Sequence, residues 1–249
     1  MAGCHVFPSG CENPGRGELP RVDRVEGTAV RFSIHPEIAI KVGFLHLSAC
    51  RITESSDALL SIFDETVNEV RQRFAESPIN EHPVAGGVRR MFKSVGIDPS
   101  RYRPSGESLV RRVLKDHALN HINSIVDINN ICSMESLFPL GVYDREKISG
   151  DVSIRLGTRD DVYYGIERSI NIEAKLVSAD DKGAFGSPIA DSDRTKVAEK
   201  TQEVLVLLYA PESTDAAAIH STLNRFAFLA GEHAGAKTED SGIFPGLKD

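Results

Sequence analysis

The sequence predicts an α+β fold, in which a mixed or antiparallel sheet is flanked by helices. Helical and extended patterns occur in blocks rather than in regular alternation, which is typical of this class. The clearest helical pattern, residues 57–74, repeats apolar residues at intervals of three and four. The clearest strand, residues 204–208, is short and wholly apolar, as expected at the centre of a sheet.

One domain, residues 28–232, is expected between an N-terminal tail, residues 1–27, and a C-terminal tail, residues 233–249. The first tail is rich in Gly, Pro and charge, and neither tail has a regular apolar pattern. Gly43 is interpreted as a bulge in a strand. The strands are predicted at residues 28–34, 38–47, 152–156, 162–166, 170–177 and 204–208. Further helices are predicted at residues 84–95, from 105, from 123 and at 216–230.

Composition predicts a soluble protein of the reducing cytoplasm. The chain has 249 residues, of which 41% are hydrophobic and 26% are charged, and its net charge is −7. It has no apolar run near 18 residues, no N-terminal signal peptide and only four cysteines. We therefore expect no membrane association, and the acidic balance argues against indiscriminate binding to nucleic acids, DNA included.

No metal and no cofactor are expected. Cys4, His5 and Cys11 are zinc-ligand types, but no second ligand pair with zinc-finger spacing follows them. Cys132 lies on an apolar helical stripe and is interpreted as a core residue rather than a nucleophile. Walker-type, GxGxxG and GxSxG motifs do not occur in the sequence.

The basic residues concentrate in residues 89–115, which hold eight basic residues against two acidic ones, a net charge of +6. Such a segment can contact phosphates. The alternative is that these side chains are solvated faces of helices. The candidates for nucleic-acid contact are Arg89, Arg90, Arg111, Arg112 and Lys115.

A helix is expected after Asn123, whose side chain can cap its N-terminus, with Asp127 near the positive end of the helix dipole. Asn129 faces the same way as the apolar stripe and must be hydrogen-bonded if it is buried. It is therefore either a tie to a neighbouring element or a group that points into a pocket. The stripe consists of Ile122, Ile125, Val126 and Cys132.

Two later segments carry polar groups in positions where a cap and a ligand contact are both plausible. Asp144 can cap the turn that follows it, or close a pocket together with Tyr143. In residues 192–195, backbone amides could hold a carboxylate or phosphate, with Arg194 adding a bidentate contact. The alternative there is an N-cap with Arg194 in a surface ion pair.

Three stretches occur in the order of one known domain: INSIVDINN (122–130), PLGVYDREKISGDVSIRL (139–156) and SDRTKVAEKTQEVLVLL (192–208). Together they resemble the tRNA-binding and editing module of the phenylalanyl-tRNA synthetase beta chain, and more closely its freestanding relatives. The match is closest over residues 120–210 and extends to residues 28–232 in the freestanding relatives. The resemblance implies a phenylalanyl-tRNA synthetase editing-domain-like fold.

The chain departs from the family pattern at positions that matter for editing. Asn129 and Asn130 stand where the family has Thr-Asn, and Asp191-Ser192 stands for Gly-Gly. Gly141 stands where the bacterial editing histidine would be, and Leu207 where a glutamate recognises the tyrosine hydroxyl. The resemblance therefore does not imply tyrosine-specific proofreading, because a phenolic hydroxyl among apolar groups is left without a partner.

Two hypotheses follow from the resemblance. The first is a freestanding aminoacyl-tRNA deacylase that clears a mischarged tRNA in trans; no synthetase catalytic core is recognised in the sequence. The second is a non-catalytic module that binds tRNA or a small amino-acid-like ligand. Asn130 and Asp193 are the candidate catalytic residues. The candidate substrate-binding residues are Asn123, Asp127, Asn129, Gly141, Tyr143, Asp144, Asp191, Ser192, Arg194 and Thr195.

Overall fold

Two four-stranded sheets organise the residues that the computed structural model describes, 31–165 and 169–245. One sheet is antiparallel, in the order β3-β7-β2-β8, and the other is mixed, in the order β1-β4-β5-β6. This confirms the predicted class. The strands are β1 (Phe32–Ile34), β2 (Ile40–Ser48), β3 (Leu140–Asp144), β4 (Val152–Leu156), β5 (Leu176–Asp180), β6 (Gly183–Gly186), β7 (Val204–Pro211) and β8 (Lys237–Phe244).

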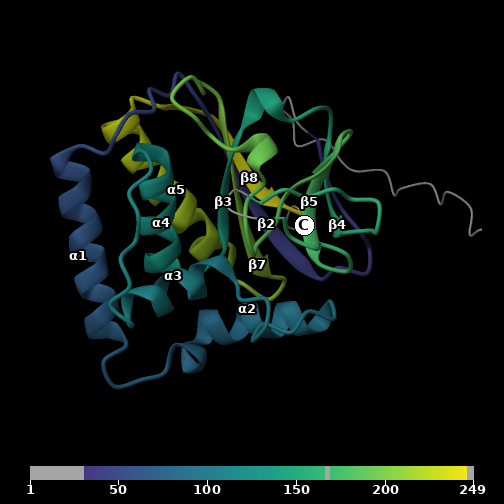
Figure 1. Cartoon of the computed structure of the whole chain (residues 1–249), viewed down its shortest axis with the longest axis horizontal. Coiled ribbons are helices and arrows are strands. Elements are labelled where there is room, and N and C mark those ends of the chain that lie inside the picture. The colour runs from purple at the N-terminus through teal and green to yellow at the C-terminus, as the bar shows by residue number, and fades with distance from the viewer. Residues whose placement is uncertain (1–30, 166–168, 246–249) are drawn as a thin grey trace, which may run out of the picture.

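The longer helices gather on one side of the antiparallel sheet, and strands β4 and β5 lie on its other side (Figure 1). α4 is central, since it packs against α1, α3, α5 and β3. The helices are α1 (Asp57–Arg73), α2 (Pro83–Ser94), α3 (Ser105–Val113), α4 (Ser124–Ser136) and α5 (Ala216–Ala234). Three short 3₁₀ turns are η1 (Ile79–Glu81), η2 (Arg145–Lys147) and η3 (Asp193–Thr195).

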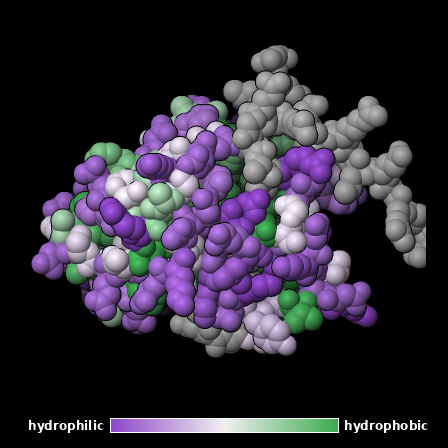
Figure 2. All heavy atoms as spheres, turned by 90° about the horizontal axis from the view of Figure 1, so that it is seen from above, coloured by the Kyte–Doolittle hydropathy of each residue, from purple (hydrophilic) through white to green (hydrophobic). Residues whose placement is uncertain are grey.

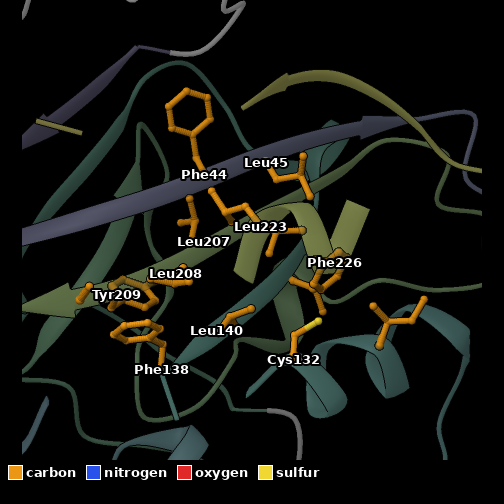
Figure 3. Packing of buried hydrophobic residues seen from close by; sticks show 14 of the residues in the cluster. Phe44, Leu45, Cys132, Phe138, Leu140, Leu207, Leu208, Tyr209, Leu223 and Phe226 are labelled. Carbon is orange, nitrogen blue, oxygen red and sulfur yellow. The ribbon is translucent and has the colours of Figure 1, made fainter. Parts of the chain in front are cut away.

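Strand β7 lies at the centre of the hydrophobic core, as its apolar run predicts. Its first seven residues are buried, and successive side chains point to opposite faces of the sheet. Leu207 pairs with Phe44 of β2, whereas Leu208 pairs with Gly43 on the face that α5 covers (Figure 3). Both faces of the antiparallel sheet are therefore covered.

Gly43 is not a bulge; the register shift of β2 against β8 lies between His46 and Leu47. A Cβ atom on Gly43 would lie 2.6 Å from Cγ2 of Ile219 and 3.2 Å from Cδ1 of Leu223, both on α5. Glycine is therefore required at this position because α5 approaches the strand closely.

Gly43→Ala is expected to lower the free energy of unfolding by about 1–3 kcal/mol, since overpacking displaces well-packed neighbours. Gly87→Ala is the matched control, because its Cβ would meet only ordinary contacts at 3.4 and 3.8 Å inside α2. The control is expected to be neutral or stabilising. Urea unfolding of the two variants measures both effects, and equal stabilities would contradict the close packing of α5.

The C-terminal segment differs from the prediction. Residues 233–249 were expected to be a tail, but α5 continues to Ala234 and Lys237–Phe244 form β8, paired with β2. Strand β8 is an edge strand with no buried residue, so pairing with β2 rather than burial of apolar residues holds it. Such a strand leaves no hydrophobic alternation in the sequence.

The mixed sheet also differs in detail. The predicted strand at 170–177 begins only at Leu176, after a turn in which Ala174 has a φ of 55°. Tyr164 and Gly165, from the predicted strand at 162–166, form only isolated bridges to Ser169 and Ser192.

The predicted N-terminal tail, with Cys4, His5 and Cys11, lies outside the described residues. Within the described ranges no helix is long and apolar enough to cross a membrane. Figure 2 shows a face dominated by hydrophilic side chains, with hydrophobic residues in small separate patches.

Candidate functional site

Helix α4 carries the central residue of the candidate site. Asn123 Oδ1 accepts a hydrogen bond from the Val126 amide at 3.0 Å, which confirms the predicted N-cap. At the other end Leu137 adopts the left-handed conformation and ends the helix before Pro139. Fixed at both ends, the helix presents Asn130, which is partly exposed, on the wall of a pocket.

That pocket has a volume of about 360 Å³ and is built from segments far apart in the sequence. The end of α3, the connection to α4, α4 itself and the segments near residues 165–170 and 190–191 contribute to it. Its apolar wall consists of Leu109, Leu119, Ile122, Ile170 and Ala190, with Gly165. Its polar groups are Arg112, Asn120, Asn130 and Asp191. A mainly apolar pocket with a few polar groups is the usual form of a small-ligand site.

Asn120 and Ile122 were not predicted as site residues. Ile122 was placed on the buried stripe of the helix, but it precedes the Asn123 cap and is 62% exposed at the pocket. The cap itself was the signal for this, since a residue before an N-cap lies outside the helix and need not follow its apolar face.

Asp127 and Asn129 are buried in α4 and are not among the residues that line the pocket. Asp127 Oδ2 accepts from Ser55 Oγ at 2.6 Å and lies 2.9 Å from His121 Nδ1, so Asp127 ties α4 to two other segments. Asn129 Oδ1 has no hydrogen-bond partner within the described chain. The structural tie considered for Asn129 is therefore made by Asp127 instead.

The three predicted residues of β3, Gly141, Tyr143 and Asp144, are not among the residues that line the pocket. Asp144 caps η2 by accepting from the Glu146 amide, and its other oxygen accepts from Thr201 Oγ1 at 2.7 Å. This is the capping alternative. Tyr143 is fully buried, and its hydroxyl lies 3.4 Å from that of Tyr209.

Gly141 and Leu207 are directly opposite each other in the β3-β7 pair. The two positions at which the chain departs most from the editing pattern are thus neighbours on one face of the sheet. Leu207 is fully buried. A Cβ atom on Gly141 would collide with the Tyr143 hydroxyl and lie 2.8 Å from Oδ1 of Asp191. The space beside Gly141 is therefore filled by polar groups of other residues.

The buried polar groups beside Gly141 are hydrogen-bonded to a residue of the mixed sheet. Ser178 Oγ of β5 lies 2.7 Å from the Tyr209 hydroxyl, so Ser178, Tyr209 and Tyr143 form a buried hydrogen-bonded chain. Burial raises the pKa of Tyr143 and of Tyr209 above the usual range. These hydroxyls therefore stay neutral at physiological pH and can donate hydrogen bonds.

Burial also raises the pKa of Asp191, to about 7, although a hydrogen bond from Tyr143 partly opposes this shift. A carboxyl group with such a pKa changes its protonation state in the neutral range. Among the predicted site residues, Asp191 is thus the acid that both lines the pocket and titrates near neutral pH.

The segment 192–195 that was expected to hold a substrate is occupied by contacts within the chain. Ser192 caps η3, and Thr195 Oγ1 donates to the Phe185 carbonyl. Arg194 forms a bidentate pair with Asp180 at 3.1 and 2.9 Å. This segment therefore follows the alternative of an N-cap with Arg194 in an ion pair. The pair differs from the expected surface pair because the side chain of Asp180 is buried.

Asp193 was proposed as a catalytic partner of Asn130, but the structure does not place the two together. Its carboxylate is exposed and paired with Lys196 at 2.6 Å, and Asp193 is not among the residues that line the pocket. The reason is local: Asp193 is the first residue of η3, which Ser192 caps, whereas Asp191 precedes this turn and lines the pocket.

Part of the basic segment is neutralised by a buried acid. Glu107, whose side chain is only 2% exposed, accepts from Arg89 Nη1 at 3.0 Å and from Arg111 Nε at 2.7 Å. Arg103 Nε lies 3.8 Å away. Arg89 therefore joins α2 to α3, and Arg111 pairs with Glu107 within α3, so both are poor candidates for phosphate contact. The candidates that remain are Arg90, Arg112 and Lys115, all exposed.

Glu107→Gln is expected to lower the free energy of unfolding by about 2 kcal/mol. Breaking a buried pair typically costs about 3–5 kcal/mol, but here the arginines retain access to water, which reduces the cost. The control is Glu135→Gln, whose pair with Arg225 is more exposed and should contribute about 1 kcal/mol or less. Thermal unfolding compares them, and an equal loss in both would contradict the special role of Glu107.

Comparison with known proteins identifies the domain. The family model "B3/4 domain" matches residues 87–227. A phenylalanine–tRNA ligase beta subunit of Nocardia farcinica is 32% identical over 157 residues, which are 59% of this chain and 18% of the relative. The beta subunit of Nitrobacter winogradskyi is 33% identical over 106 residues, which are 41% of this chain and 13% of the relative.

This chain thus covers less than one fifth of the length of these relatives. An N-terminal fragment of the phenylalanyl-tRNA synthetase beta subunit from Pyrococcus horikoshii superposes with a TM-score of 0.48 at 12% identity, covering 92% of this chain and 58% of the fragment. Because the family model matches more than half of its residues, the chain belongs to the B3/4 domain family.

Proposed function

We propose that this protein binds tRNA and hydrolyses the ester of a mischarged aminoacyl-tRNA in trans. The observation that carries the proposal is the pocket that both Asn130 and Asp191 line within a B3/4 domain. The relatives are named as phenylalanine–tRNA ligase beta subunits, which act on tRNA, and the domain they share with this chain covers only a small part of their length. The shared part therefore supports an association with tRNA.

The pocket has the chemistry that an aminoacyl ester requires. Its volume of about 360 Å³ accommodates an amino-acid side chain with its ester group. Leu109, Leu119 and Ile170 offer an apolar surface to the side chain. The amide of Asn130 can donate to the ester carbonyl oxygen, where negative charge develops in the transition state of hydrolysis.

The residues beside this pocket disfavour tyrosine as the amino acid. Leu207 is fully buried and apolar, and Gly141 contributes no side chain. Neither position can therefore supply the polar partner that selects a phenolic hydroxyl in the editing pattern. The apolar wall favours an aliphatic amino acid instead, and this preference is part of the proposal.

One observation favours a second candidate, a non-catalytic tRNA- or amino-acid-binding module. Among the described residues that line the pocket there is no His, Ser, Thr or Cys, so no imidazole, hydroxyl or thiol side chain is present as a nucleophile. Hydrolysis would then depend on activated water and on positioning, which can still supply a large part of a rate enhancement.

The experiment that separates the two candidates is a deacylation panel. Purified protein is incubated with tRNAs that carry correct and incorrect amino acids, and release of the labelled amino acid is followed. The proposal predicts release from at least one mischarged tRNA, with an aliphatic amino acid preferred over tyrosine. No release from any of them, with charged tRNA still retained on a filter, would establish the binding module.

A further inference from the structure

Asp191 differs from the other carboxylates of low exposure in the described part of the chain. Except for Asp240, whose buried Oδ2 has no partner among the described residues, the others accept hydrogen bonds or ion pairs from groups of the fold. These are Asp127, Asp144, Asp161, Asp180 and Glu107. Among the described ion pairs none involves Asp191, and its Oδ1 lies beside the Tyr143 hydroxyl, since both atoms are within 3 Å of the position of a Cβ on Gly141. Because Asp191 lines the pocket, its carboxylate can act on a ligand there.

The position of Asp191 follows from the absence of a side chain at residue 141. Oδ1 of Asp191 lies 2.8 Å from where a Cβ of Gly141 would be, next to the Tyr143 hydroxyl. Any larger residue at 141 would displace the carboxylate or the tyrosine. The glycine thus leaves room for Asp191 to sit between the pocket and the buried chain of Tyr143, Tyr209 and Ser178.

The groups around Asp191 allow it to gain and lose a proton in the neutral range. Burial raises its pKa to about 7. Tyr143 of β3, Tyr209 of β7 and Tyr163 face it from neighbouring segments, and burial raises the pKa of each, so that they remain neutral. Arg112 of α3 is the positively charged residue among the described residues that line the same pocket. A general base works best when its pKa is close to the operating pH.

We infer that Asp191 is the general base of the pocket, which activates water for attack on an aminoacyl ester held beside Asn130. This inference rests on the proposed function and names the group that performs its chemistry. Tyr143 is a positioning residue, since it holds the carboxylate by donating a hydrogen bond and does not touch the ester.

The step balances without any further reactant. A water oxygen attacks the ester carbonyl carbon while Asp191 accepts one of the water protons. The new carbon–oxygen bond forms, and the bond to the ribose oxygen then breaks with its electron pair going to that oxygen. The proton passes from Asp191 to the ribose oxygen. The products are the free amino acid and deacylated tRNA, and the carboxylate is restored.

The first test is Asp191→Asn, measured as single-turnover deacylation of the tRNA that the wild-type protein hydrolyses best. The maximal rate is expected to fall about 100-fold or more, while the concentration for half-saturation stays within about 3-fold. An amide in place of a partly buried carboxylate removes a charge rather than adding one, so the fold is expected to persist. A thermal melt checks this.

The alternative role for Asp191 is to bind the α-ammonium group of the amino acid. In that case Asp191→Asn would mainly raise the half-saturation concentration, and this result would overturn the inference. Asp193→Asn provides the matched comparison two residues away, where the carboxylate is exposed and paired with Lys196. A larger loss in Asp193→Asn than in Asp191→Asn would also overturn it.

The second test is the pH profile of the maximal rate, corrected for spontaneous hydrolysis. In the wild-type protein the rate is expected to rise with pH and to level off above about 7, where Asp191 is deprotonated. Tyr143→Phe removes a hydrogen bond that lowers the pKa of Asp191, so the inflection moves to higher pH. Asp191→Asn loses the inflection. A purely structural role of Tyr143 would lower the rate without moving the inflection.

The outcomes distinguish this inference from the proposed function. If the wild-type protein deacylates tRNA and Asp191→Asn matches its rate and pH profile, the inference is wrong and the function stands. If the wild-type protein deacylates none of the tRNAs, both are wrong. Loss of the maximal rate and of the inflection in Asp191→Asn, with half-saturation retained, supports both.

Discussion

Replacing Asn130 with alanine is expected to slow deacylation of the preferred mischarged tRNA by about 100-fold, because a lost donor to a developing oxyanion typically costs that much or more. Asn130 is the polar residue that α4 contributes to the pocket, and the helix that carries it is capped at Asn123 and packed on several sides. The donor is therefore held rigidly, as stabilisation of a transition state requires. Binding of tRNA should be unchanged, since the residues proposed to contact phosphates are Arg112 and Lys115 rather than Asn130.

The measurement is single-turnover release of the labelled amino acid, with filter binding of the same tRNA alongside. Asn224→Ala is the matched control, because Asn224 is an exposed asparagine of α5. The control should deacylate at the wild-type rate. If Asn130→Ala also keeps the wild-type rate, the assignment of the pocket is wrong even though the protein is an enzyme.

The second large effect, a loss of affinity for tRNA, is expected from Arg112→Gln combined with Lys115→Gln. Both residues are exposed near the end of α3, and Arg112 also lines the pocket. If each contacts one phosphate, the slope of log affinity against log salt should decrease by about 1–2. The affinity for tRNA near 0.15 M salt is then expected to fall about 10- to 100-fold.

Neither substitution touches the pair that Glu107 makes with Arg89 and Arg111, so the fold should be retained. Arg31→Gln with Arg159→Gln is the control with the same change in net charge, since both arginines lie in exposed ion pairs. Equal losses of affinity in the two double variants would mean that net charge, rather than this surface, governs binding.

Much of the fold could be predicted because its elements carry local patterns. α1 has an apolar face with a spacing of three and four, α4 has its Asn123 cap, and β7 is a continuous apolar run. Strand β8 could not be predicted, because an exposed edge strand needs pairing rather than burial. Gly43 in a strand could mark either a bulge or a close approach of another element, and only the contact with α5 decides between the two.

The candidate site was less predictable, because its walls come from positions up to 82 residues apart, from Leu109 to Asp191. The resemblance to a known family drew attention to Asn130 and Asp191. It did not separate Asp191 from Asp193, since both are acids in one loop and only the turn at η3 gives them opposite surroundings. It also could not show that a buried Glu107 neutralises Arg89, because that pair joins α2 to α3, whereas the pair with Arg111 lies within α3 at a spacing of four residues.

The most direct test of the central claim is a structure of the protein with a non-hydrolysable aminoacyl-adenosine amide that carries an aliphatic side chain. The account predicts that the side chain lies against Leu109, Leu119 and Ile170, and that the amide carbonyl is within hydrogen-bond distance of Asn130, with Asp191 facing the carbonyl carbon. Binding at any other surface, with this pocket empty, would contradict it.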